Sequence, residues 1–177
     1  MNVNEQRNMM GTLKAFDRSE HNVYDTKGKE AMIKLLNRKL SKFDLKTIEN
    51  PNQYGIDLLT VNSLNKVVHC WEIEVRHGNW QGDISFPFRE INCIERKDYQ
   101  WRRDNEFLKK IPLEMANNYK VSYVQLNKEC TRAVIIEGDT ILKYPLKQWA
   151  NRKATNEYVR QVPISETVQI KIASLVE

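Results

Sequence analysis

Two acidic side chains and an arginine occur at alternate positions in one segment of the chain. Glu72, Glu74 and Arg76 are each separated by one apolar residue. The surrounding segment, residues 66–76, is rich in β-branched and aromatic residues, which predicts a strand. Side chains alternate between the two faces of a strand, so these three share one face with about 6.6 Å between neighbours. The opposite face is largely apolar and should pack in the core.

A further carboxylate, Asp57, lies on a strand predicted over residues 54–61, and residues 62–65 form a hairpin turn. A turn centred near residue 63 or 64 pairs Asp57 close to Cys70, one step from Glu72. If Asp57 points to the same face, two or three carboxylates converge, and they repel one another unless a cation lies between them. Mg²⁺ prefers such oxygen ligands and can activate a water for phosphodiester hydrolysis. Arg76 would suit the scissile phosphate through its forked donors.

The elements that must position these side chains follow from periodicity and turn residues. A helix is predicted from Asp25 or Thr26 to about Leu40, and a basic helix over residues 95–110. Besides the two central strands, extended segments are predicted over residues 43–48, 121–126, 131–137 and 141–144, with an edge strand at Val168, Ile170 and Ile172. This order predicts an α/β or α+β sandwich with a mixed sheet.

The motif Gly55-Ile56-Asp57, followed by a hairpin and Ile73-Glu74-Val75-Arg76, resembles that of the PD-(D/E)XK nuclease superfamily. The resemblance covers residues 28–126 and implies an α/β, restriction endonuclease-like αβββαβ core with a mixed central sheet flanked by helices. It also implies a DNA endonuclease that depends on Mg²⁺ or Mn²⁺. Asp57 and Glu74 would be metal ligands and Glu72 a third acidic group. In a second register, Glu72 is the carboxylate and Glu74 takes the place of the family's lysine.

Arg76 departs from the family motif, which usually has lysine there. Arginine stays protonated and cannot act as a base. Arg76 would therefore only orient the phosphate, or Lys97 would fill the role of the family's lysine. A catalytically inactive nucleic-acid-binding or assembly module of the same fold is therefore the alternative. Glu30 matches a position where many members add an acidic metal ligand, although a first-turn helix acid is the simpler interpretation.

The predicted helix over residues 95–110 is rich in basic side chains and follows the candidate site. The residues expected to contact nucleic acid are Arg76, Arg96, Lys97, Arg102 and Arg103. The net charge, 28 basic minus 23 acidic residues or +5, is compatible with DNA as partner and leaves RNA open. Trp80, Phe86 and Phe88 are expected to pack in the core rather than to stack on bases.

The length of 177 residues fits one domain. Its expected parts are an N-terminal arm over residues 1–26, the core over about 28–126, and C-terminal strands with an extension over 127–177. Neither a membrane span nor a secretory signal is expected. Three widely spaced cysteines favour a reducing compartment, hence the cytoplasm. The stretches Phe86-Pro87-Phe88, Glu95-Arg96-Lys97 and Leu126-Asn127-Lys128 are also similar to phage nuclease-like proteins, which implies the host cytoplasm. The resemblance to the nuclease superfamily also implies a homodimer as a partner state.

Overall fold

The computed structural model describes residues 18–103, 106–149 and 158–172, and its centre is a six-stranded sheet. The strand order is β1(Lys46–Glu49), β2(Leu58–Val61), β3(Val67–Arg76), β5(Lys120–Asn127), β6(Arg132–Glu137) and β9(Val168–Lys171). β3 and β5 run parallel, and the other neighbouring pairs are antiparallel. The predicted α/β class with a mixed sheet is thus confirmed, and β9 lies at the sheet edge as expected.

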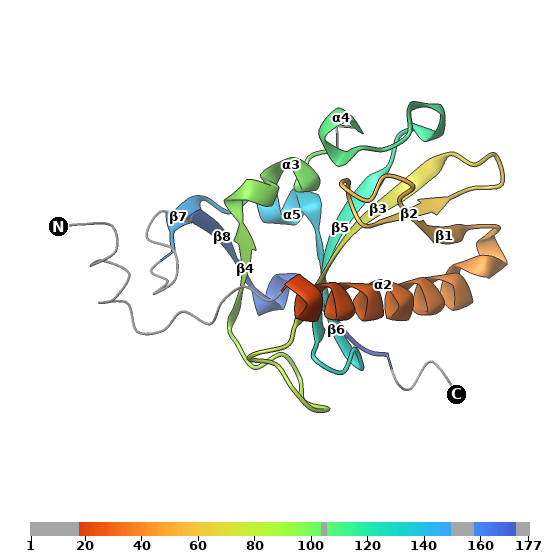
Figure 1. Ribbon diagram of the computed structural model, residues 1–177. Coiled ribbons are helices and arrows are strands. Elements are labelled where there is room, and N and C mark those ends of the chain that lie inside the picture. Colours follow the sequence, from red (N-terminus) through yellow and green to blue (C-terminus); the bar gives the residue numbers. More distant parts are fainter. Residues whose placement is uncertain (1–17, 104–105, 150–157, 173–177) are drawn as a thin grey trace.

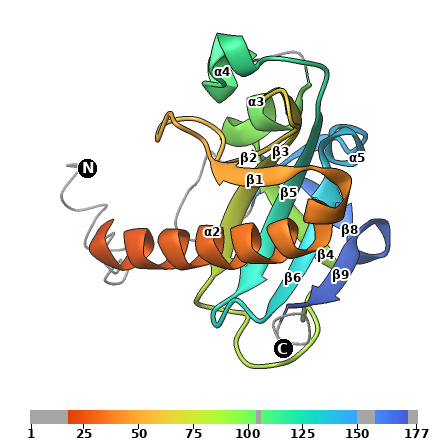
Figure 2. The ribbon, with the colours of Figure 1, turned by 90° about the vertical axis from the view of Figure 1, so that its right-hand side faces the viewer.

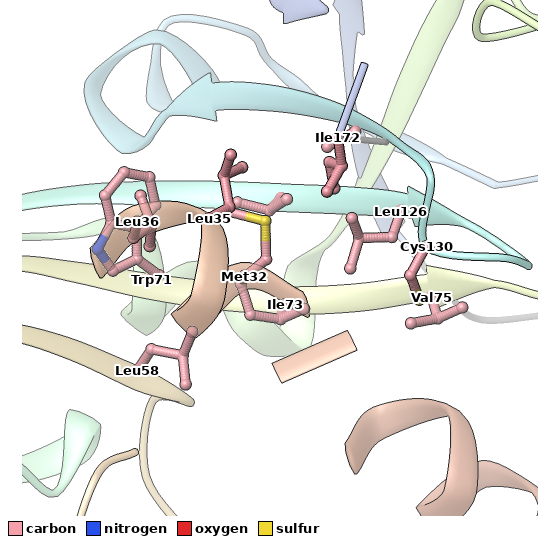
Figure 3. Close-up of a cluster of buried hydrophobic side chains, with 12 residues drawn as sticks. Met32, Leu35, Leu36, Leu58, Trp71, Ile73, Val75, Leu126, Cys130 and Ile172 are labelled. Carbon is pink, nitrogen blue, oxygen red and sulfur yellow. The ribbon is translucent and has the colours of Figure 1, made fainter. Parts of the chain in front are cut away.

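One face of this sheet is covered by the long helix α2(Arg18–Leu40), which Figures 1 and 2 show running across the strands β5 and β6. Met32, Leu35 and Leu36 recur at the spacing that places side chains on one helix face. They pack against apolar residues of β3 such as Ile73 (Figure 3). Gly28 allows this approach, because a Cβ there would lie 2.7 Å from Val75 Cγ2.

The other face packs against a second sheet of three strands, in the order β4(Glu90–Ile94), β8(Tyr158–Pro163) and β7(Leu146–Gln148). Two short helices, α3(Asp98–Trp101) and α5(Gly138–Leu142), belong to the same layer. Trp80 and Phe86 are buried in this layer, as expected, whereas Phe88 is 40% exposed. A separate cluster of buried apolar side chains lies next to α4(Glu106–Lys109) and a 3-10 turn, Leu113–Met115. Further 3-10 turns are Ser41–Phe43 and Ile164–Glu166.

The prediction of one continuous helix over residues 95–110 is wrong. The structure has a 3-10 turn, Glu95–Lys97, then α3 and, after a break, α4. Arg102 takes an extended backbone conformation and ends α3 directly after Trp101, which is fully buried. The extended backbone of Arg102, and not the apolar pattern, therefore interrupts the predicted helix.

Two other expectations are corrected. Residues 141–144 do not form a strand, because α5 begins at Gly138, where a Cβ would lie 2.5 Å from the backbone oxygen of Trp101. Glycine therefore lets the chain turn against α3 instead of continuing as a strand. The predicted arm over residues 1–26 is helical from Arg18 onward, and residues 1–17 lie outside the described part. Within the described residues, helices are too short or too polar to cross a membrane.

Candidate functional site

The register of the β2–β3 hairpin brings Asp57 beside Glu72. Leu58 pairs with Trp71, so the preceding residue, Asp57, comes opposite Glu72 and not opposite Cys70 as predicted. The cause is an irregularity in the pairing between Thr60 and Val61, which shifts the register. The backbone N–H of Ile73 donates a hydrogen bond of 2.8 Å to Asp57 Oδ2, which fixes the carboxylate at this edge.

A cleft of about 570 Å³ opens above these side chains. Four segments supply its charged lining: α2, the residue before β2, the carboxyl end of β3, and the turn that follows β4. The residues concerned are Asp25, Asp57, Glu72, Glu74, Arg76 and Lys97. All but two of these were predicted as catalytic residues, Lys97 was predicted as a substitute for the family's lysine, and Asp25 was predicted only as a possible helix cap. The structure therefore brings the central predicted set together.

Glu72 is the most deeply buried carboxylate of the cleft, with 5% of its surface exposed. Its Oε1 lies 2.5 Å from Lys97 Nζ, and no described group donates a hydrogen bond to its Oε2. Burial and the neighbouring charge of Asp57 raise the pKa of Glu72 to about 7, although Lys97 opposes this rise. A carboxylate of this kind stores unfavourable energy in its ionised form, which a bound cation would relieve.

Two lysines balance the negative charge of the cleft. Lys97 pairs with Glu72, and Lys29 of α2 lies 3.1 Å from Asp57 Oδ1. Burial alone would lower the pKa of each lysine, but the carboxylates outweigh it and the pKa of both is raised. Both side chains therefore stay charged and act as fixed positive groups rather than as bases.

A chain of hydrogen bonds links the remaining carboxylate to Arg76. The hydroxyl of Tyr123 donates to Glu74 Oε2, Gln125 Nε2 donates to the Tyr123 oxygen at 2.6 Å, and Arg76 Nε donates to Gln125 Oε1 at 2.5 Å. The Arg76 guanidinium also lies 5.6 Å and 5.7 Å from the ring centres of Phe86 and Phe88. Parallel pairing of β3 with β5 supplies this chain, since Gln125 faces Glu74. Arg76 is thus held at the cleft as a preorganised cation.

The donor chemistry of the cleft fits a hard divalent cation, which takes carboxylate oxygens and keeps water ligands. Glu72 Oε2 is a buried oxygen that no described donor satisfies, and Asp57 lies next to it. Among the described residues, however, no three His, Cys, Asp or Glu side chains are gathered closely enough to hold a metal ion by themselves. In this conformation lysine ammonium groups balance the carboxylates instead.

Other predicted residues do not join the cleft. Glu30 is exposed on α2 and does not line it, whereas its neighbour Lys29 contacts Asp57. Arg102 and Arg103 are exposed and lie near Asp98 and Asp139 respectively. Arg96 falls in the 3-10 turn before α3, and its side chain lies outside what the structure describes.

Sequence reasoning missed five residues of the site: Asp25, Lys29, Tyr123, Gln125 and Trp149. A signal existed for two of them, because Tyr123 and Gln125 are polar side chains at alternate positions of an otherwise apolar predicted strand. Polar side chains on a strand that is buried within a sheet need hydrogen-bond partners, so these two positions indicated polar contacts. Lys29 and Trp149 reach the site only through the packing of α2 and of the segment after β7, which no local pattern encodes.

The sequence matches no known protein-family model, and no curated protein matches it. A function for this protein therefore has to be argued from the chemistry of the cleft.

Proposed function

We propose that the protein is a nuclease that hydrolyses phosphodiester bonds of DNA with Mg²⁺ or Mn²⁺. The observation that carries the proposal is the convergence of Asp57 and Glu72, with Glu74 beside them, in one cleft that also contains Lys97 and Arg76. Carboxylates supply the oxygen ligands that these cations prefer, and the two basic side chains match a phosphate.

The order of elements also supports a relation to the PD-(D/E)XK superfamily. Helix α2, strands β1, β2 and β3, helix α3 and strand β5 follow one another as in an αβββαβ core, with β4 added before α3. Because Asp57 comes opposite Glu72, the hairpin favours the register in which Glu72 is the second carboxylate and Glu74 stands in the lysine position.

The residues of the cleft divide the chemistry among them. A divalent cation held by Asp57 and Glu72 would activate a water and neutralise charge on the phosphate. Lys97 carries its ammonium group beside Glu72 and stays protonated, so it would contact the scissile phosphate and stabilise developing negative charge. Arg76 would orient the same phosphate through its fork of donors, since its Nε is held by Gln125.

Cleavage of plasmid and branched DNA with Mg²⁺ or Mn²⁺ tests the proposal. Asp57→Asn and Glu72→Gln should lower the rate at least about 100-fold, because a ligand oxygen loses its charge. Glu166→Gln is the matched control, since Glu166 is exposed on a turn outside the cleft. Equal cleavage by the wild type and both cleft variants would show that another site, or a contaminant, does the cutting.

The pairing of Lys29 with Asp57 and of Lys97 with Glu72 favours a second candidate function, a nucleic-acid-binding or assembly module without catalysis. In such a module the lysines would permanently replace the metal. It predicts DNA binding that weakens as salt concentration rises, together with no cleavage at any concentration of Mg²⁺ or Mn²⁺.

A further inference from the structure

The cleft has aromatic side chains in its lining as well as charged ones. Trp149, which directly follows β7, and His77, which directly follows β3, both line it. The His77 ring stacks on Tyr24 of α2, with ring centres 4.7 Å apart and planes 4° from parallel. Two flat rings from separate parts of the chain therefore line the same cleft as the carboxylates, Lys97 and Arg76, and one of them is backed by Tyr24.

The size and lining of the cleft limit what can enter it. Its volume is about 570 Å³, and Trp149 and His77 lie in the same lining as the carboxylates, so a strand that places a phosphate there brings its bases to these rings. In a duplex the flat face of each base is covered by its neighbours, so an aromatic side chain can stack only on a base that is unpaired or displaced.

We infer that the cleft binds a single-stranded segment of DNA, with a base stacked on Trp149 and its phosphates beside Lys97 and Arg76. The inference rests on the proposed function, because it assigns the substrate class of the same site. The His77–Tyr24 pair provides a second stacking surface for a neighbouring base. Single-stranded DNA, or a strand splayed from a duplex, is then the preferred substrate.

The tryptophan content of the chain makes the inference testable without any cleavage. Trp71, Trp80 and Trp101 are 8%, 1% and 0% exposed, whereas Trp149 is only half-buried and lines the cleft. A thymidine oligonucleotide titrated in EDTA should therefore quench the emission of the wild-type protein through Trp149. The same titration of Trp149→Phe should show no quenching, while its affinity, measured by anisotropy of a labelled oligonucleotide, stays within about threefold because a ring remains.

Trp149→Leu removes the ring and should weaken single-strand binding by about 10-fold, the loss of one base–aromatic stack. Tyr54→Leu is the matched control, since Tyr54 is 76% exposed but lines a different groove, and its affinity should equal that of the wild type. A duplex of the same length should bind the wild type more weakly than the single strand. If circular dichroism shows that Trp149→Leu does not fold, the fluorescence titration of Trp149→Phe shows by itself whether Trp149 contacts the strand.

Several results would overturn the inference: no single-strand binding, equal or tighter duplex binding, or quenching that persists in Trp149→Phe. These results differ from a failure of the proposed function. Metal-dependent cutting of duplex DNA only would leave the nuclease proposal in place and refute the single-strand preference. Trp149-dependent single-strand binding without any metal-dependent cutting would support the single-strand inference and refute the nuclease proposal.

Discussion

Replacing Glu72 by glutamine should stabilise the protein at alkaline pH. Glu72 is buried, one of its oxygens has no described donor, and its pKa is raised from 4.5 to about 7. The ionised form is therefore disfavoured in the folded state despite its contact with Lys97. Glutamine has nearly the same shape and keeps an oxygen for Lys97, but it carries no charge to bury.

The size of the effect follows from the pKa. The difference between 4.5 and about 7 corresponds to about 3 kcal/mol of folding free energy, at about 1.4 kcal/mol for each tenfold change. Because the folded-state pKa is the higher one, wild-type stability from this group is fully present below about pH 4.5 and is lost as the pH rises to about 7. At pH 8 we expect Glu72→Gln to gain only about 1 kcal/mol of this, which is about 2–4 °C for a chain of this size, because Lys97 loses the carboxylate that raises its pKa. The loss is limited because the Lys97 side chain is 30% exposed and Glu74 and Asp57 also act on it.

Thermal unfolding of the wild type and Glu72→Gln, followed by circular dichroism at pH 5, 6, 7 and 8, measures this difference. The midpoints should diverge as the pH rises, and Glu166→Gln should track the wild type because Glu166 is exposed. Lys97→Met should instead destabilise at pH 8 by about 1–2 kcal/mol, since Glu72 loses its cation and takes up a proton rather than staying charged, and the loss should nearly disappear when Glu72→Gln is combined with it. A Glu72→Gln midpoint below that of the wild type by the same amount at every pH would show that Glu72 is not strained by its charge.

Two further changes test how the core holds the site. Gly28→Ala should lower the free energy of unfolding in urea by about 1–2 kcal/mol, because its methyl would lie 2.7 Å from Val75 Cγ2, and this outweighs the better helix propensity of alanine. Gly78→Ala is the control and should change stability little, since nothing lies within 4 Å of a Cβ there. Equal effects at the two positions would mean that the contact with Val75 is unimportant. Thr60→Val should cost about 1–3 kcal/mol by the same measurement, since Thr60 Oγ1 accepts the 2.9 Å hydrogen bond of the buried Trp71 indole, and no loss would mean that this bond contributes nothing.

The central sheet could be predicted because its strands follow simple local rules. Period-two alternation located β3, and the polar turn at residues 62–65 located the hairpin, where Asn62 Oδ1 accepts hydrogen bonds from the backbone N–H groups of Leu64 and Lys66. Counting back from that turn placed Asp57 near Glu72 but in the wrong register, because an irregularity in strand pairing leaves no mark in hydrophobic patterning.

The second sheet could not be predicted in the same way. β7 has only three residues and all of them are exposed, so its pairing with β8 is set by tertiary contacts rather than by alternation. The basic segment over residues 95–110 was misread because charge content does not distinguish one helix from two short ones. In the structure α3 ends after Trp101, where the backbone of Arg102 becomes extended.

The carboxylates of the candidate site were predictable, whereas the groups that control them were not. Asp57, Glu72 and Glu74 lie in one hairpin, close together in sequence. Lys29 and Tyr123 come from a helix and a strand far away in the chain, and they meet the carboxylates only when α2 packs on the face of the sheet and β5 pairs with β3 within it. Charge balance at the site is therefore a property of the tertiary structure.

Calorimetric titration of the protein with Mn²⁺ at pH 8 shows whether Asp57 and Glu72 together bind a divalent cation. At this pH Glu72 is largely ionised, since its pKa is about 7. We expect one binding site in the wild type and in Glu166→Gln, and none in Asp57→Asn. No binding by the wild type, or equal binding by Asp57→Asn, would mean that these two carboxylates do not hold a metal ion.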